Sequence, residues 1–299
     1  LHARDGNLRD IERISRVLLG EATGLVLGAG ASRGFAHLGV IKALEAAGKP
    51  IDFIGGSSIG AIMATPTAMG LTADQGIRLM RKAFMRGKPF SDFTLPLVSL
   101  LSGGRMQRLL REHADVQIED LPIPFFCISS NLDDGSINVH QSGSMARALQ
   151  ATASMPGILP PTVVNGRLAV DGAVLNGLPV DVMWQQAVGE VMAVSLATHG
   201  TMEVDYTDTP SAWAVLRNRW LPFTRPYRVP AMMTVVLKAT ELATMNIVRL
   251  QGERASLLIQ PDVRRFALTE VRAFDDILQA GYTAAEETLH HRANPARDL

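Results

Sequence analysis

Residues 23–60 read TGLVLGAGASRGFAHLGVIKALEAAGKPIDFIGGSSIG, and this stretch decides the fold. An apolar run of strand length, TGLVLG, leads into a glycine-rich turn and then into helical spacing that ends at Gly48. A second apolar run, IDFIGG, is followed by two serines and by another helical pattern that begins at Ile59. Two successive strand–turn–helix units predict an α/β fold, with helices on the faces of a mostly parallel sheet.

The alternation of strand and helix patterns continues to the end of the chain. Further helices are predicted at 7–20, 71–87, 104–114, 142–154, 231–250 and 272–290, and further strands at 124–132, 136–140, 167–173 and 190–197. No repeat, low-complexity segment or later linker interrupts this pattern. We therefore expect residues 1–20 to form an N-terminal linker helix and residues 21–299 to form one domain.

The composition limits which binding partners and which cellular compartment suit this chain. The 299 residues include 29 basic and 29 acidic side chains, so no overall field favours nucleic acid as a partner. The single cysteine, Cys127, excludes an internal disulfide framework and fits a reducing compartment. No apolar run is long enough to span a membrane, and no signal peptide is visible. We expect a location in the cytoplasm or, peripherally, at the cytoplasmic face of a membrane.

The two adjacent serines differ in their neighbours. Ser58 fits the pattern G-x-S-x-G, with Gly56 and Gly60 on either side, whereas the frame of Ser57 ends on the bulky Ile59. A nucleophile on a sharp turn between a strand and a helix needs neighbours without side chains, and the helix N-terminus favours developing negative charge. Ser58 is the candidate nucleophile; alternatively, the glycines make only a connecting turn.

The glycine-rich turn GAGASRG (28–34) supplies free backbone N–H groups of the kind that hold an oxyanion during acyl transfer. We expect Gly30, Ala31 and their neighbours to be these donors, with the Ile59 N–H group as an addition. The turn also resembles a dinucleotide-binding loop, in which Asp52 would bind the ribose. That interpretation fits less well, because Arg33 stands where the third glycine belongs.

A serine hydroxyl needs a base, and the sequence offers two candidates. His199 follows a predicted strand and would suit a Ser–Asp–His order. Asp171 ends the predicted strand RLAVD and precedes a glycine, which would expose a carboxylate at the edge of the sheet. From the spacing alone, both remain open.

Four motifs in order, GAGASRG, GSSIG, SMPGILPP and DGA, resemble those of the patatin-like phospholipases. Within that family, the stretches TGLVLGAGASRGFAHLGVIKALEAAG and LAVDGAVLNGLPVDVM are similar to the catalytic domain of the neuropathy target esterase type. The resemblance covers residues 7–290, and such relatives often carry cyclic-nucleotide-binding modules and a membrane anchor upstream. We expect this chain to be an isolated catalytic piece of that type.

The resemblance implies a three-layer α/β/α sandwich and hydrolysis of phospholipid or lysophospholipid esters, without metal or cofactor. It implies Ser58 as nucleophile and Asp171 as base. The implied oxyanion hole comprises Gly28, Ala29, Gly30, Ala31, Ser32, Arg33 and Gly34. Three residues depart from the family pattern, because Ala29 and Ala173 replace glycines and Gly177 replaces an asparagine. An alternative is therefore a weak or inactive lipid-binding module.

Residues 209–240 combine basic and aromatic side chains without any acid. The basic residues are Arg217, Arg219, Arg225, Arg228 and Lys238, and the aromatic residues are Trp213, Trp220, Phe223 and Tyr227. Such mixtures suit a membrane interface with anionic headgroups. This segment is a candidate for peripheral membrane contact, or else a helix and loop packed on the domain itself.

Overall fold

The computed structural model describes residues 4, 7–197, 207–208, 210–211, 213–214, 217 and 230–294. Within them, one mixed sheet follows the order β5-β6-β3-β2-β1-β7-β8, and β4 pairs with β3. The strands are β1 (Thr23–Leu27), β2 (Phe53–Ser57), β3 (Phe125–Asn131), β4 (Ile137–His140), β5 (Thr162–Val164), β6 (Arg167–Asp171), β7 (Glu190–Val194) and β8 (Leu257–Ile259). The central pairs are parallel, whereas β4, β5 and β6 pair antiparallel.

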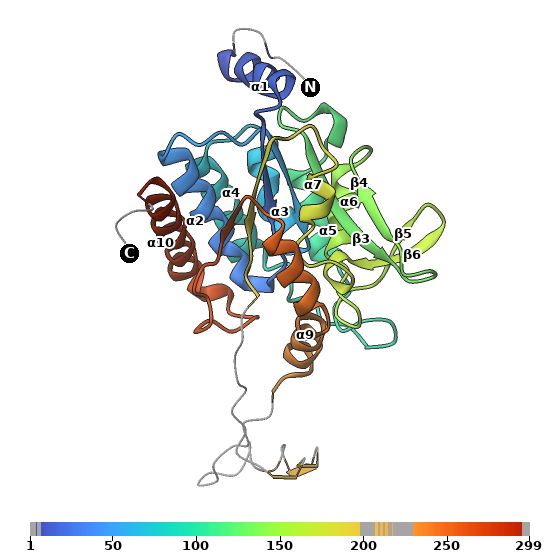
Figure 1. Ribbon diagram of the computed structural model, residues 1–299. Helices are drawn as coiled ribbons and strands as arrows, with labels where there is room; N and C mark the ends of the chain where they lie inside the picture. Colours follow the sequence, from blue (N-terminus) through green and yellow to red (C-terminus); the bar gives the residue numbers. More distant parts are fainter. Residues whose placement is uncertain are drawn as a thin grey trace.

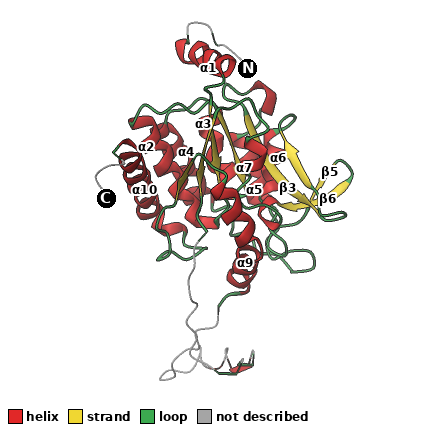
Figure 2. Cartoon of the chain, viewed as in Figure 1, coloured by secondary structure: helices red, strands yellow, loops and turns green. Residues whose placement is uncertain are grey.

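Helices cover both faces of this sheet and make a three-layer α/β/α sandwich (Figures 1 and 2). The helices are α1 (Leu8–Leu19), α2 (Phe35–Ala46), α3 (Ile59–Ala68), α4 (Ala73–Gly87), α5 (Gly104–His113), α6 (Met145–Thr152), α7 (Val180–Met183), α9 (Met232–Glu253) and α10 (Phe274–Ala293). Helices α2–α6 and α10 share the larger core on one face, and α7 lies in the smaller core on the other. The fold class predicted from the sequence is confirmed.

Strand β1 shows why its sequence reads as continuously apolar. Leu25 and Leu27 belong to the larger core, whereas Val26 between them belongs to the smaller core. Successive side chains of a strand point to opposite faces, and both faces of this strand are covered by helices. Each residue of β1 is therefore buried, and no polar residue interrupts TGLVLG apart from Thr23 at its start.

Strand β3 brings the ends of two distant strands together. Strand β4 pairs with one edge of β3, from Cys127 to Ser130. On the opposite edge, β2 pairs only as far as Ile128, and β6 pairs from Ser129 onwards. The carboxyl ends of β2 and β6 consequently meet head to head, which brings the residue after Ser57 close to Asp171.

Helix α1 is held to the domain by charged side chains. Arg16 donates two hydrogen bonds to Asp52, at 2.9 and 2.7 Å, and the Thr23 N–H group donates a third at 3.0 Å. Gly20 ends the helix in the left-handed conformation, as its position in the sequence predicts. The division into a linker helix and a hydrolase domain stays a prediction.

Three of the described strands and helices were not expected from the sequence, namely β5, β8 and α7. Strands β5 and β8 have only three residues each, and helix α7 has four, so none of them offers a period long enough to recognise. The other predicted elements are present, with ends that differ by a few residues.

Candidate active site

Ser58 stands on a sharp turn between β2 and α3. Its backbone has φ 54° and ψ −127°, a conformation that costs a non-glycine residue of order 1–3 kcal/mol. A Cβ atom at Gly56 would lie 2.4 Å from the Leu27 carbonyl oxygen, and one at Gly60 would lie 2.1 Å from the same oxygen. Both glycines are needed because the turn passes against the end of β1.

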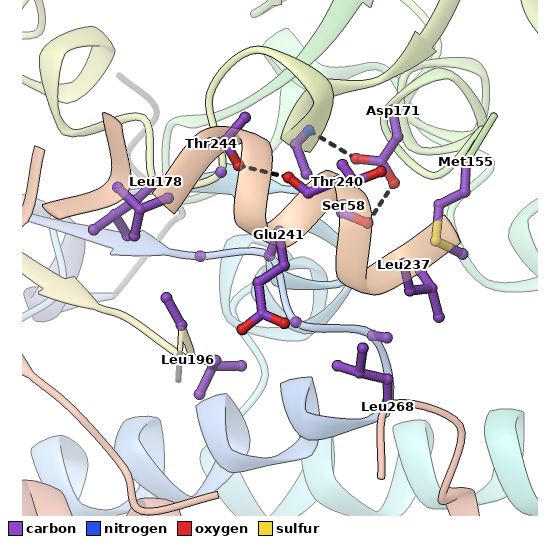
Figure 3. A pocket seen from close by; sticks show the side chains of 18 of the residues that line it. Ser58, Met155, Asp171, Leu178, Leu196, Leu237, Thr240, Glu241, Thr244 and Leu268 are labelled. Carbon is purple, nitrogen blue, oxygen red and sulfur yellow. Dashed lines mark hydrogen bonds between the residues drawn. The ribbon is translucent and has the colours of Figure 1, made fainter. Parts of the chain in front are cut away.

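The Ser58 hydroxyl lies against the Asp171 carboxylate (Figure 3). The Ser58 Oγ atom donates a hydrogen bond of 2.6 Å to Asp171 Oδ2, and the Ala173 N–H group donates one of 2.8 Å to Oδ1. Asp171 is buried, with an exposed fraction of 1%, and Ser58 reaches only 7%. The contact joins residues that are 113 positions apart in the sequence.

Burial changes the acidity of this carboxyl group. Removal from water disfavours the charged form and raises the pKa of Asp171 from 3.8 to about 7, against the opposing hydrogen bonds from Ser58 and Ala173. A carboxylate with a pKa near neutrality accepts a proton far more readily than an ordinary aspartate does. The site thus pairs a hydroxyl with a basic group.

Histidine takes no part in this arrangement among the described residues. His199 lies outside them. His37 is fully buried and hydrogen-bonds the Gly28 carbonyl oxygen through Nε2 at 2.7 Å, and burial lowers its pKa to about 4. His140 Nε2 bonds the Ser129 hydroxyl at 2.8 Å. His37 therefore supports the glycine-rich turn from behind.

Some N–H groups of the glycine-rich turn already donate to carbonyl oxygens, whereas others remain able to bind an oxyanion. Gly28 donates to Val194, Ala29 to Gly177, Ser32 to Leu268 and Arg33 to Gly30, in each case to the carbonyl oxygen. The N–H groups of Gly30 and Ala31 have no acceptor among the described residues, and both residues line the same cavity as Ser58. The Ile59 N–H group likewise has no described acceptor.

Two further members of the turn point away from the cavity. The Arg33 side chain donates from Nε to the Phe266 carbonyl oxygen at 2.9 Å and lies 4.0 Å from Glu241. Gly34 packs closely on Ile59, whose Cγ1 atom would lie 2.4 Å from a Cβ atom there. These two residues shape and anchor the turn.

Two of the three departures from the family pattern, Ala29 and Ala173, fit the backbone. Ala29 and Ala173 are not among the described non-glycine residues with positive φ, so an alanine side chain adds no strain at either position. Ala31 does have positive φ, at 49°. The strained positions of the site are therefore Ala31 and Ser58, which face the same cavity.

Ser58 lies where two cavities meet. The smaller one is also lined by Asp171, the glycine-rich turn and residues of α9 (Figure 3). The larger one, of about 450 Å³, is mainly apolar and runs between α3, α4 and the first turns of α9. Its lining includes Phe35, Ile62, Phe84, Phe90, Met233 and Leu268. A volume within the usual range of small-molecule sites, roughly 300–1,000 Å³, opens directly on the serine.

The sequence did not indicate that residues of α9 would line one side of the smaller cavity. Leu237, Thr240, Glu241 and Thr244 face the smaller cavity (Figure 3). The apolar stripe of 231–250 predicted a helix, but not which cavity it would cover. Thr152 was also missed; its Oγ1 atom accepts a hydrogen bond of 2.9 Å from the Ser58 N–H group.

The described residues hold no cluster of three metal-ligating side chains. No helix among them is long and apolar enough to cross a membrane. Asp52 lies at the amino end of β2, where Arg16 and the Thr23 N–H group occupy its carboxylate. It is therefore at the wrong end of the strand for a ribose-binding role beside the glycine-rich turn.

Comparison with known proteins agrees with this geometry. The model of the family described as patatin-like phospholipase matches residues 25–184, a segment that contains the glycine-rich turn, Ser58 and Asp171. The chain belongs to the patatin-like phospholipase family. Lysophospholipase NTE1 of Meyerozyma guilliermondii is 33% identical over 285 residues, which are 93% of this chain and 20% of that protein.

A second relative is neuropathy target esterase sws of Drosophila melanogaster, 31% identical over 303 residues, with 96% of this chain and 21% of that protein covered. This member of the family thus spans about a fifth of the length of such relatives. Among solved structures, VipD from Legionella pneumophila superposes with a TM-score of 0.52 at 13% identity, covering 90% of this chain and 67% of that one. That likeness supports the shared fold.

Proposed function

We propose that this chain hydrolyses acyl esters of phospholipids or lysophospholipids, with Ser58 as nucleophile and Asp171 as base. The observation that carries the proposal is the hydrogen bond of 2.6 Å between Ser58 Oγ and Asp171 Oδ2, at the junction of two cavities. The names of the relatives, lysophospholipase and neuropathy target esterase, support an ester of the phospholipid type as substrate.

Acylation begins at the Ser58 hydroxyl. Asp171 accepts its proton as Oγ attacks the ester carbonyl carbon, and the N–H groups of Gly30 and Ala31 stabilise the oxyanion. The N-terminus of α3 beneath Ser58 adds a favourable dipole. The intermediate then collapses; Asp171 returns its proton to the leaving alcohol, and the acyl group remains on Ser58.

Deacylation repeats these steps with water. Asp171 takes a proton from the attacking water, and the same N–H groups hold the second oxyanion. When the Ser58–acyl bond breaks, the proton passes from Asp171 to Ser58 Oγ, and the fatty acid leaves. One buried carboxyl group with a pKa of about 7 can serve as base and acid in turn.

The apolar lining of the larger cavity suggests that the acyl chain of the substrate binds there, beside Ser58. Its lining is dominated by apolar side chains from α2, α3, α4 and α9, and it ends at the serine. Burial of methylene groups contributes about 0.8 kcal/mol each, so a chain of several carbons would supply substantial binding. The alcohol part of the ester would then occupy the smaller cavity.

We also propose membrane contact through residues 209–240 and a location in the cytoplasm or at the cytoplasmic face of a membrane. Trp213 supports the contact because 82% of it is exposed. Arg219, Trp220, Phe223, Arg225, Tyr227 and Arg228 lie outside the described residues. Lys238 contributes less than expected, since its Nζ atom bonds Glu241 at 2.9 Å. The buried thiol of Cys127 fits a reducing compartment.

Hydrolysis of three substrates tests the reaction: a lysophospholipid, a diacyl phospholipid and a short-chain ester. We expect wild type to release fatty acid and Ser58→Ala and Asp171→Ala to lose at least about 10³-fold in kcat. His199→Ala is the control. Full activity of Asp171→Ala together with loss in His199→Ala would replace the dyad by a triad.

A fluorophosphonate probe separates an enzyme from an inactive lipid-binding module. Only an activated serine reacts, so wild type should be labelled and Ser58→Ala should not. Wild-type protein that binds lipid but resists the probe would establish the inactive alternative.

A further inference from the structure

The loop between α4 and α5 carries an exposed apolar tip. Phe93, Leu95, Leu97 and Val98 are 72%, 73%, 84% and 70% exposed, and Pro96 lies among them. Burying such side chains is worth about 1.5–3 kcal/mol each, so four of them within six residues leave a large stabilisation unused. We define residues 93–98 as the apolar tip.

The apolar tip stands on a rigid base. Phe93 pairs with Leu101 in an antiparallel bridge, and the Thr94 N–H group donates to the Leu100 carbonyl oxygen at 3.1 Å. Leu100 and Leu101 donate in turn to the carbonyl oxygens of Gly157 and Ile158, both at 2.9 Å. Leu101 and Ile158 are fully buried in a small core that the first half of α9 completes. These contacts tie both ends of the tip to the body of the domain and leave its apolar side chains facing solvent.

Basic residues flank the apolar tip on both sides. Residues 75–111 contain eight basic side chains and a single acid, Asp92, in a chain whose total charge is zero. Arg86 and Lys88 at the end of α4, and Arg105 and Arg108 at the start of α5, are exposed. Asp92 is half-buried, and its Oδ2 atom accepts hydrogen bonds from Ser102 Oγ at 2.7 Å and from the Arg105 N–H group at 3.1 Å. An apolar tip between exposed cations matches the surface of an anionic lipid bilayer.

The apolar tip also joins the mouth of the larger cavity. Phe93 lines that cavity together with Met232, which is 59% exposed at the start of α9. The same cavity reaches Ser58 at its inner end. A continuous apolar path therefore leads from the tip to the serine.

We infer that residues 93–98 insert into the acyl region of an anionic phospholipid membrane, while the flanking cations bind its headgroups. This places the mouth of the larger cavity at the level where acyl chains begin. The apolar tip shares no residue with the segment 209–240 proposed above for membrane contact. The idea that a lipid passes from the membrane to Ser58 rests on the proposed function. Membrane docking of the apolar tip does not depend on that function.

Co-sedimentation with vesicles of phosphatidylcholine and phosphatidylserine tests the docking. All proteins carry Ser58→Ala, so that vesicles stay intact. We expect Leu95→Asp/Leu97→Asp to lower vesicle partition at least about tenfold. Leu18→Asp is the matched control, because Leu18 is 80% exposed on α1, at the opposite end of the molecule from the N-terminal end of α9 (Figure 1). It should bind like its parent.

Two further measurements separate docking from chemistry. In the active background, Leu95→Asp/Leu97→Asp should hydrolyse a soluble short-chain ester at the wild-type rate, which also shows that it folds. Arg86→Gln/Lys88→Gln should weaken binding to vesicles with phosphatidylserine but change little with phosphatidylcholine alone. Absence of ester hydrolysis in wild type would remove the proposed function and leave the docking result valid.

Environment-sensitive fluorescence adds a direct readout of insertion. Leu97→Cys can be labelled selectively, because the native Cys127 is fully buried. The fluorophore should shift to shorter wavelength on vesicles. Three results would each overturn the inference: no vesicle binding by the parent, equal loss in the tip and Leu18 variants, or an unshifted probe.

Discussion

Asp171→Asn should stabilise the fold while abolishing hydrolysis. The folded protein holds the proton of this carboxyl group far more tightly than the unfolded chain, because its pKa rises from 3.8 to about 7 on burial. Stability from this residue is complete below about pH 4 and is lost as the pH rises to about 7. The amide side chain introduced by Asp171→Asn has nearly the same shape but does not ionise, so the variant does not lose stability as the pH rises.

The magnitude follows from the two pKa values. One pH unit corresponds to 1.36 kcal/mol, so the interval between 3.8 and about 7 gives an upper limit of about 4 kcal/mol at pH 8. Near pH 4 the two proteins should differ little. The asparagine can still accept from the Ala173 N–H group, which limits the change in hydrogen bonding.

Urea denaturation of wild type and Asp171→Asn between pH 4 and 9 measures this difference. We expect the variant's advantage to grow between pH 4 and 7 and then to stay level. Ser58→Ala should do the opposite, because the Ser58 hydrogen bond lowers the pKa of Asp171 and its removal enlarges the loss at high pH. An advantage that is the same at every pH, or one that grows toward low pH, would refute a buried carboxyl group with a raised pKa.

Three other predictions concern the site. The ratio kcat/KM should rise with pH through about 7, since Asp171 must be ionised to act as base, and a pH–rate profile that is already level from pH 5 would contradict this. Gly60→Ala should cost at least about 3 kcal/mol in urea denaturation, because its Cβ atom would lie 2.1 Å from the Leu27 carbonyl oxygen, whereas Gly104→Ala, with its nearest neighbour at 3.6 Å, should change stability by under about 0.5 kcal/mol. Met233→Trp should fill the larger cavity and lower hydrolysis of a long-chain lysophospholipid at least about tenfold, with a short-chain ester cleaved nearly as by wild type.

Local features of the site could be predicted from the sequence because their causes are local. The frame around Ser58 and the flanking glycines follow from the close passage of the turn against β1. The alternating patterns also predict the sheet and most helices. By contrast, the sequence cannot give the register at which β6 takes over the edge of β3 from β2. That register brings Asp171 to Ser58, and spacing alone left His199 as an alternative.

The N–H groups that could hold the oxyanion are a second feature that the sequence alone could not identify. The sequence names seven residues in the turn, but carbonyl groups from Gly177, Val194 and Leu268 decide which N–H groups are engaged. These carbonyls come from parts of the chain far from the turn, so only the tertiary structure separates Gly30 and Ala31 from their neighbours.

Helix α9 and Leu268, which wall the two cavities, lie after the segment 25–184 that defines the family, whereas Ser58 and Asp171 lie within it. Part of the lining of both cavities is thus encoded after the segment that holds the proposed dyad, while residues such as Phe35, Ile62 and Phe84 contribute the rest of the larger cavity from within it. Substitutions in that later region can change the shape of both cavities without altering Ser58 or Asp171. We expect chimaeras that exchange only the residues after 184 between two such proteins to reshape the α9 side of both cavities while keeping Ser58 and Asp171.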